Sequence, residues 1–171
     1  MDIESALSLE NMKEFSIEEL LGMAIKAEIG AVEFYKSLAE KIEVRALKER
    51  IRALAEEEKK HELLLREMYR SMFGEKEIKF PREHIGPELK PVERELRDIK
   101  DVIELIRWAM TAEKMASEFY KKLGEIVDSE EKKRLTRYLS NMEKGHYYML
   151  RAEYELLLDW SMYSQMMHVG P

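Results

Sequence analysis

Apolar residues recur every three or four positions over four long stretches of the chain, and this spacing predicts four amphipathic helices. We expect these helices at about residues 17–42, 45–72, 98–127 and 130–160. Ser16 and Glu19 have the spacing of a capping box before the first helix. Gly74 ends the second helix, and Asp128 with Ser129 offers a cap for the fourth. No segment shows the convincing period of two that a strand requires, so the fold class is all-α.

Residues 73–97 separate the second predicted helix from the third and carry three of the four prolines. This linker is long enough to run back along a helix, whereas the other two connections are short. We therefore expect a single domain over residues 1–171, in which two antiparallel helix hairpins are joined by a long crossover. That topology is a one-crossover four-helix bundle.

The chain contains an internal repeat, because residues 24–69 align without a gap on residues 109–154 at an offset of 85. Many identities are alanines, lysines and leucines, which any two amphipathic helices share. Three others are more informative, because they repeat chemically reactive side chains within predicted helices. They are Glu28 with Glu113, Glu58 with Glu143, and His61 with His146.

Two of the repeated carboxylates are predicted to face the core. Glu28 lies in the middle of the apolar stripe of the first predicted helix, and Glu113 occupies the same place in the third. A lone ionised carboxylate in an apolar core is very costly, so such a group is usually neutralised, paired or bound to a metal.

Two E-x-x-H segments supply the partners. Glu58 and His61 project from one face of the second predicted helix, and Glu143 with His146 repeats that geometry in the fourth. Four carboxylates and two imidazoles would then converge, as in di-iron and di-manganese carboxylate bundles. Two divalent cations would balance the four carboxylate charges. We expect two iron ions, with manganese or zinc as alternatives.

The repeat also separates these six residues from their neighbours. Glu56 and Glu57 have counterparts without a carboxylate, so we interpret both as surface charges. Tyr35 and Tyr120 lie on the inner stripes, either as core aromatics or as hydroxyls that bond to a ligand carboxylate.

The linker and the C-terminal end contain further residues of interest. His84 and His168 are expected to be solvated. The apolar residues near the C-terminus form either a subunit contact or a frayed tail. They are Trp160, Met162, Met166 and Met167.

Composition excludes several classes of protein. The chain has no cysteine, and therefore no disulfide, thiolate zinc site, iron-sulfur cluster or cysteine nucleophile. Its net charge of −6 argues against a general nucleic-acid binder. No run approaches the roughly 18 apolar residues of a membrane helix, and the first residues lack a signal-peptide pattern. We expect a cytoplasmic protein without a membrane partner.

The phrase A-x-x-x-E-x-x-A-x-x-F-Y, which starts at Ala24 and again at Ala109, and the two E-x-x-H segments resemble the rubrerythrins of the ferritin-like di-iron carboxylate superfamily. The resemblance covers about residues 17–158. It implies a bridged di-iron centre, a homodimer or larger assembly, and reduction of hydrogen peroxide in defence against oxidants. It also implies terminal, bridging and imidazole ligands, which would be Glu28 with Glu113, Glu58 with Glu143, and His61 with His146.

The sequence departs from that family in two respects. Rubrerythrins carry a cysteine-ligated rubredoxin-type module, so here the electrons would come from a separate protein such as a rubredoxin. The family's additional carboxylate one turn after the helix-three Glu is replaced by Ala116. Three other functions stay open: a ferroxidase or iron-handling protein that reacts with dioxygen, a di-iron oxygenase with an apolar substrate pocket, and a non-catalytic bundle that binds zinc or manganese.

Overall fold

The computed structural model describes the backbone of residues 10–167 and the side chains of residues 10–163, and the all-α prediction is confirmed. A short 3-10 helix at Asn11–Glu14, which the sequence pattern did not predict, precedes four long helices. These are α1 (Ile17–Lys41), α2 (Arg45–Phe73), α3 (Ile99–Ile126) and α4 (Glu130–Met167).

The helix ends follow from local sequence. The Ser16 side chain accepts a hydrogen bond from the Glu19 N–H, and the Glu19 carboxylate accepts one from Ser16, so the capping box forms. Gly74 ends α2 with a φ of 78°, a left-handed conformation that favours glycine. Helix α4 continues beyond its expected end near residue 160, because neither glycine nor proline interrupts the sequence before Gly170.

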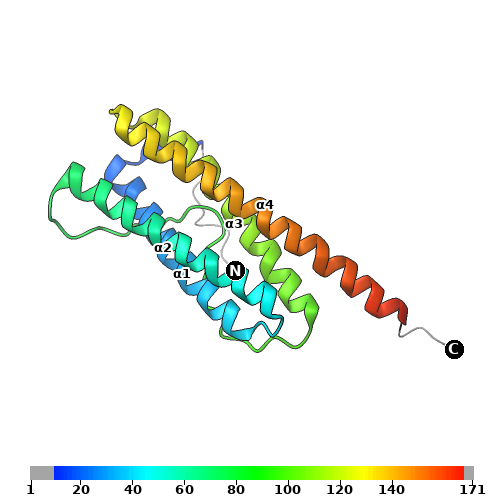
Figure 1. Ribbon diagram of the computed structural model, residues 1–171. Coiled ribbons are helices and arrows are strands. Elements are labelled where there is room, and N and C mark those ends of the chain that lie inside the picture. Colours follow the sequence, from blue (N-terminus) through cyan, green and yellow to red (C-terminus); the bar gives the residue numbers. More distant parts are fainter. Residues whose placement is uncertain (1–9, 168–171) are drawn as a thin grey trace.

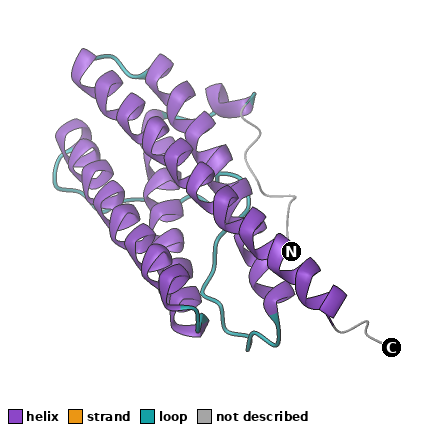
Figure 2. Ribbon diagram, turned by 45° about the vertical axis from the view of Figure 1, so that its right-hand side comes forward, coloured by secondary structure: helices purple, strands orange, loops and turns teal. Residues whose placement is uncertain are grey.

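The helices pack as two antiparallel hairpins, α1 with α2 and α3 with α4 (Figure 1). The long crossover returns along the bundle, so α2 and α3 run in the same direction (Figure 2). Contact between α2 and α4 is much sparser than contact within either hairpin. None of the described helices is long and apolar enough to cross a membrane.

The crossover, residues 74–98, lies tightly against α1 at two glycines. A Cβ atom on Gly30 would come within 2.7 Å of the Leu89 carbonyl oxygen, and Gly22 meets the crossover backbone even more closely. The Val92 N–H donates a hydrogen bond of 2.8 Å to the Ser37 hydroxyl. These close approaches place the irregular crossover over the side of the bundle formed by α1 and α3.

Two apolar clusters fill the interior, one toward each end of the bundle. Leu20, Phe119 and Leu139 belong to the first cluster. Leu38 and Ile106 belong to the second. The repeated glutamates and histidines come from the helix segments between these clusters, so a buried polar layer lies across the middle of an otherwise apolar core.

Candidate metal centre

The structure brings together the six residues that the sequence singled out as ligands. Helices α1 and α3 each contribute one glutamate, whereas α2 and α4 each contribute a glutamate and a histidine. All six are buried, each with at most 4% of its surface exposed: Glu28, Glu58, His61, Glu113, Glu143 and His146.

The histidines and two of the glutamates form a pseudo-twofold cluster. His61 Nδ1 lies 3.0 Å from Glu58 Oε2 and 2.8 Å from Glu143 Oε1. His146 Nδ1 lies 3.0 Å from Glu143 Oε2 and 2.8 Å from Glu58 Oε1. The two imidazole rings stack with their centres 5.4 Å apart. The repeat in the sequence is therefore a repeat in space, and each of these carboxylates lies between both imidazoles.

Two tyrosines hold the remaining glutamates from the opposite hairpin. The Tyr120 hydroxyl donates a hydrogen bond to Glu28, and the Tyr35 hydroxyl donates one to Glu113. Burial, together with the neighbouring carboxylates, raises the pKa of both phenols well above the usual range, so they stay protonated donors. Their contacts correspond to the second of the two interpretations that the sequence left open.

The donor set is suited to a cation. Potential ligand atoms of Glu58, His61, Glu143 and His146 all lie within 4.8 Å of one another. Among the described residues, Glu58 Oε1 and Glu143 Oε1 are buried without a hydrogen-bond partner. An imidazole nitrogen approaches each of them to 2.8 Å but not in a hydrogen-bonding direction. Buried oxygens in this state are costly, and a metal ion would satisfy them.

The electrostatics show how the charges balance without a metal. Burial and neighbouring carboxylate charges raise the pKa of Glu28 and Glu113 well above its usual range. Burial opposes charge on the rings and on Glu143, but the close contacts between the imidazoles and the carboxylates around them outweigh it. They raise the pKa of His61 to about 9, raise that of His146 further, and lower the pKa of Glu143 to about 2. In the metal-free protein, protons on the glutamates and histidines with raised pKa values therefore supply the positive charge that cations would otherwise supply.

Glu57 corrects the surface interpretation made from the sequence. Its carboxylate is 40% exposed but accepts a 2.7 Å hydrogen bond from Nε2 of His146. A carboxylate behind a metal-ligating histidine orients the ring and increases its basicity. The repeat could not reveal this contact, because the equivalent residue of the other half is Met142. Glu56 is exposed, as expected.

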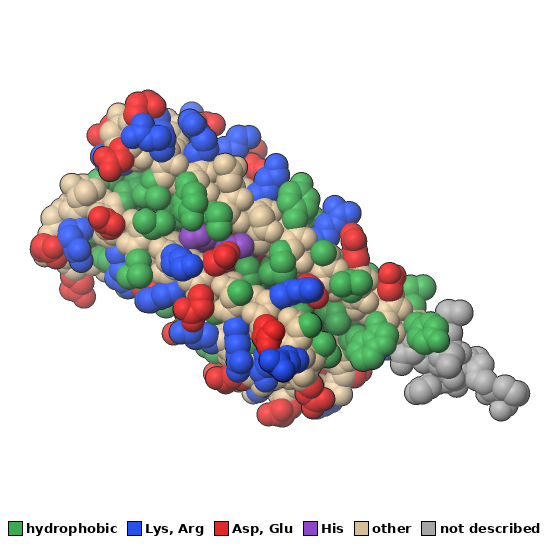
Figure 3. Space-filling model, viewed as in Figure 1, with side chains coloured by type: hydrophobic (Ala, Val, Ile, Leu, Met, Phe, Trp, Pro, Cys, Tyr) green, Lys and Arg blue, Asp and Glu red, His purple; other side chains and the backbone are tan. Residues whose placement is uncertain are grey.

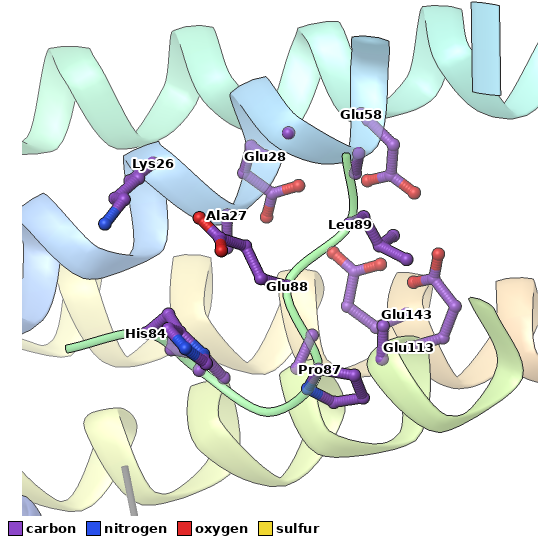
Figure 4. Close-up of a pocket in the computed structure, with 15 residues that line it drawn as sticks. Lys26, Ala27, Glu28, Glu58, His84, Pro87, Glu88, Leu89, Glu113 and Glu143 are labelled. Carbon is purple, nitrogen blue, oxygen red and sulfur yellow. The ribbon is translucent and has the colours of Figure 1, made fainter. Parts of the chain in front are cut away.

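A cavity of about 70 Å³ lies between the carboxylates and the crossover. The carboxylates of Glu28, Glu58, Glu113 and Glu143 surround it from the four helices, and Glu88 lies on the crossover (Figure 4). The prediction that His84 is solvated was wrong. This residue is 8% exposed and lines the cavity, and its Nδ1 donates to the Gly86 carbonyl at 2.8 Å. The path of the crossover, which no local pattern sets, buries it.

The opposite side of the site is more open. Between α2 and α4 a groove of about 310 Å³ reaches down to Glu57 and His146. Histidine side chains are visible there from outside, between the two helices (Figure 3). Trp160 and Met162 lie exposed further along α4. The side chains of Met166 and Met167, and all of His168, lie outside the described residues.

Comparison with known proteins agrees with this fold. A solved structure from Thermotoga maritima, described as a ferritin-like diiron-carboxylate protein, has 20% identity and a TM-score of 0.67, covering 82% of this chain and 95% of that one. The fold is therefore the ferritin-like four-helix bundle. The rubrerythrin family model matches residues 19–154, and the chain belongs to this family.

A second solved structure is a hypothetical protein from Pyrococcus furiosus. It has 70% sequence identity and a TM-score of 0.88, covering 90% of this chain and 98% of that one. No curated protein matches the chain at a significant level.

Proposed function

We propose that the chain is a di-iron oxidoreductase that reduces hydrogen peroxide in defence against oxidants. The six buried residues of the cluster would hold two iron ions. One observation carries the proposal: Glu58 and Glu143 each lie within 3.0 Å of both imidazole Nδ1 atoms. Either carboxylate can therefore bridge two cations, each of which also has an imidazole ligand.

Charge and ligand type support two redox-active ions. Four carboxylates carry a charge of −4, which two divalent cations cancel. A mixture of carboxylate and imidazole without sulfur suits iron or manganese, whereas zinc would bind without redox chemistry. Glu28 and Glu113, each held by a tyrosine, would be the terminal ligands, and Glu58 and Glu143 the bridging ligands.

The cavity favours a small oxidant. Iron bound at the cluster would supply the two electrons that, with two protons, convert hydrogen peroxide into two water molecules. A cavity of about 70 Å³ holds only a few water-sized molecules. The crossover forms one wall of it, and the small size favours peroxide or dioxygen over the larger substrate of an oxygenase. Ala116 and Leu89 give this space part of its apolar lining.

The reductant would be a separate protein. The chain has no cysteine and therefore no cysteine-ligated iron module that could pass electrons to the cluster. A rubredoxin is the kind of one-electron donor that we expect.

The experiment is anaerobic loading with ferrous iron, followed by rapid mixing with peroxide or with dioxygen while the near-ultraviolet absorbance of the iron is recorded. We expect oxidation by peroxide to be much faster. Faster reaction with dioxygen, together with ferric mineral, would identify a ferroxidase instead. A full complement of zinc in the isolated protein, without peroxide turnover after iron loading, would leave only a non-catalytic metal-binding bundle.

A further inference from the structure

An uncharged stripe runs along the edge of α4 that borders the groove between α2 and α4. Its members recur every three or four residues and therefore share one edge of the helix. The α4 stripe consists of Tyr138, Met142, Gly145, Met149, Ala152, Leu156, Trp160 and Tyr163. It spans roughly 38 Å at the rise of an α-helix. In a chain with 37% charged residues, a solvent-facing edge of this length without a charge is unusual.

Much of the α4 stripe is exposed. Leu156 and Trp160 each have 60% of their surface exposed, and Tyr163 has 61%. The last turns of α4 extend beyond the other helices (Figures 1 and 2). At the centre of the stripe the surface is recessed, because Gly145 has no side chain. Gly145 is exposed, and nothing lies within 4 Å of the position of its missing Cβ. Exposed apolar surface of this extent marks an interaction site.

The order of charges beside the α4 stripe indicates which partner fits. Arg134 and Arg137 are exposed along one flank toward the start of α4, and Glu155 and Asp159 are exposed along the same flank toward its end. If a second α4 lies antiparallel to the first, Arg134 comes beside the partner's Asp159. By symmetry the partner's Arg134 comes beside Asp159. Arg134 and Asp159 are therefore electrostatically complementary between the two copies. By contrast, Lys144 and Arg151 on the same flank are both basic, and Glu155 pairs with Arg151 of its own helix.

The apolar residues show the same self-complementarity. A twofold axis beside Tyr147 places Tyr138 opposite the partner's Leu156, and Gly145 opposite the partner's Met149. The smallest residue of the α4 stripe thus meets a long, flexible one close to the axis. Such matching about one point is what an isologous interface requires, because the same patch serves both subunits. An unrelated partner would not require it.

We propose that the α4 stripe is the interface with a second copy of this chain, with the two α4 helices antiparallel about a twofold axis beside Tyr147. A second copy seated there covers the 310 Å³ groove above Glu57 and His146. It thereby closes the side of the buried cluster that the crossover does not reach. The proposal does not depend on the proposed function, because it involves neither metal nor oxidant.

The first test is the mass of the full chain in solution, by sedimentation velocity over a range of micromolar concentrations. We expect twice the chain mass of 20.3 kDa. Leu156→Glu places an acid on the α4 stripe and should raise the dimer dissociation constant at least about 100-fold. Leu63→Glu is the matched control, because Leu63 is 55% exposed but lies on α2 outside the stripe. Circular dichroism checks that both variants stay helical.

A wild-type chain that sediments as a monomer would overturn the proposal and leave the α4 stripe for a different partner. A Leu156→Glu variant that associates as tightly as wild type would overturn it as well.

The second test fixes the orientation. Arg134→Glu should weaken the dimer about tenfold, because it puts a second acid beside the partner's Asp159 in two symmetric places. Adding Asp159→Arg in the same chain should restore the wild-type dissociation constant. Lys121→Glu on α3 makes the same change of charge outside the stripe and should have no effect. Weakening by Arg134→Glu without restoration by Asp159→Arg would rule out the antiparallel arrangement.

Discussion

Single residues in the buried layer differ in how much they depend on a metal. Glu58 and Glu143 each leave one buried oxygen without a hydrogen bond, whereas Glu28 and Glu113 each accept a hydrogen bond from a tyrosine. The first pair is therefore arranged for cations. The second pair is held in position whether or not a cation is present.

Substitutions in the run Glu56-Glu57-Glu58 separate ligands from their neighbours. Glu58→Ala removes a carboxylate that reaches both imidazoles, and we expect the purified variant to lose most of its metal. Glu57→Gln leaves all six proposed ligands but weakens the acceptor behind His146, so metal affinity should fall about tenfold. Metal content by mass spectrometry and competition with a chelator give both values. Glu56→Gln is the control, and equal losses in all three variants would contradict these assignments.

The tyrosines allow a test on the metal-free protein. Tyr120→Phe leaves the Glu28 oxygen buried without its donor, which should lower the free energy of unfolding by about 1–3 kcal/mol. Tyr35→Phe should do the same through Glu113, because the two contacts are related by the repeat. Urea unfolding followed by circular dichroism measures the loss. Tyr148→Phe, at an exposed position, should change nothing, and similar midpoints for all three variants would mean that these hydroxyls contribute no stability.

At the scale of elements, the crossover is the part of the fold with the least local definition. Its place depends on where α1 leaves room for it, at Gly22 and Gly30, and on the hydrogen bond from Val92 to Ser37. It forms one wall of the small cavity, so its position sets the space beside the carboxylates.

Gly30→Ala tests this dependence. A methyl group at residue 30 would lie 2.7 Å from the Leu89 carbonyl oxygen, so the crossover must shift. We expect a lower melting temperature, although alanine favours a helix over glycine by about 1 kcal/mol. Gly145→Ala should instead raise the melting temperature, because nothing surrounds that position. This variant is made in the Leu156→Glu background, so that dimerisation does not affect the comparison. A stabilising Gly30→Ala would mean that the crossover adjusts without cost.

At the scale of the whole molecule, the repeat determined how much the sequence could predict. The helix limits, apart from the end of α4, followed from caps and periodicity, and the six residues recur at one offset and come together in the structure. Glu57 was missed because its contact with His146 has no counterpart in the other half. His84 was misplaced because its burial depends on the path of the crossover across α1 and α3. Contacts between segments without a repeat leave no local pattern.

The balance between protons and cations in the cluster predicts opposite pH dependences for the empty and the loaded protein. The pKa of His61 is raised to about 9 from an ordinary value near 6.5, so its ring binds a proton more tightly in the folded state. Its contribution to stability is complete below pH 6.5 and is lost as the pH rises through about 9. The metal-free protein should therefore become less stable across this window.

Metal binding should show the reverse trend, because a cation at Nδ1 must displace that proton. With zinc as a redox-inert probe, we expect the apparent affinity to rise about tenfold per pH unit between pH 7 and 8.5 for each proton released. Calorimetry in buffers of different ionisation enthalpy counts those protons directly. His84→Ala, outside the cluster, should keep the same slope. An affinity independent of pH would mean that binding releases no proton, so that the imidazoles and the four carboxylates are already deprotonated in the empty site.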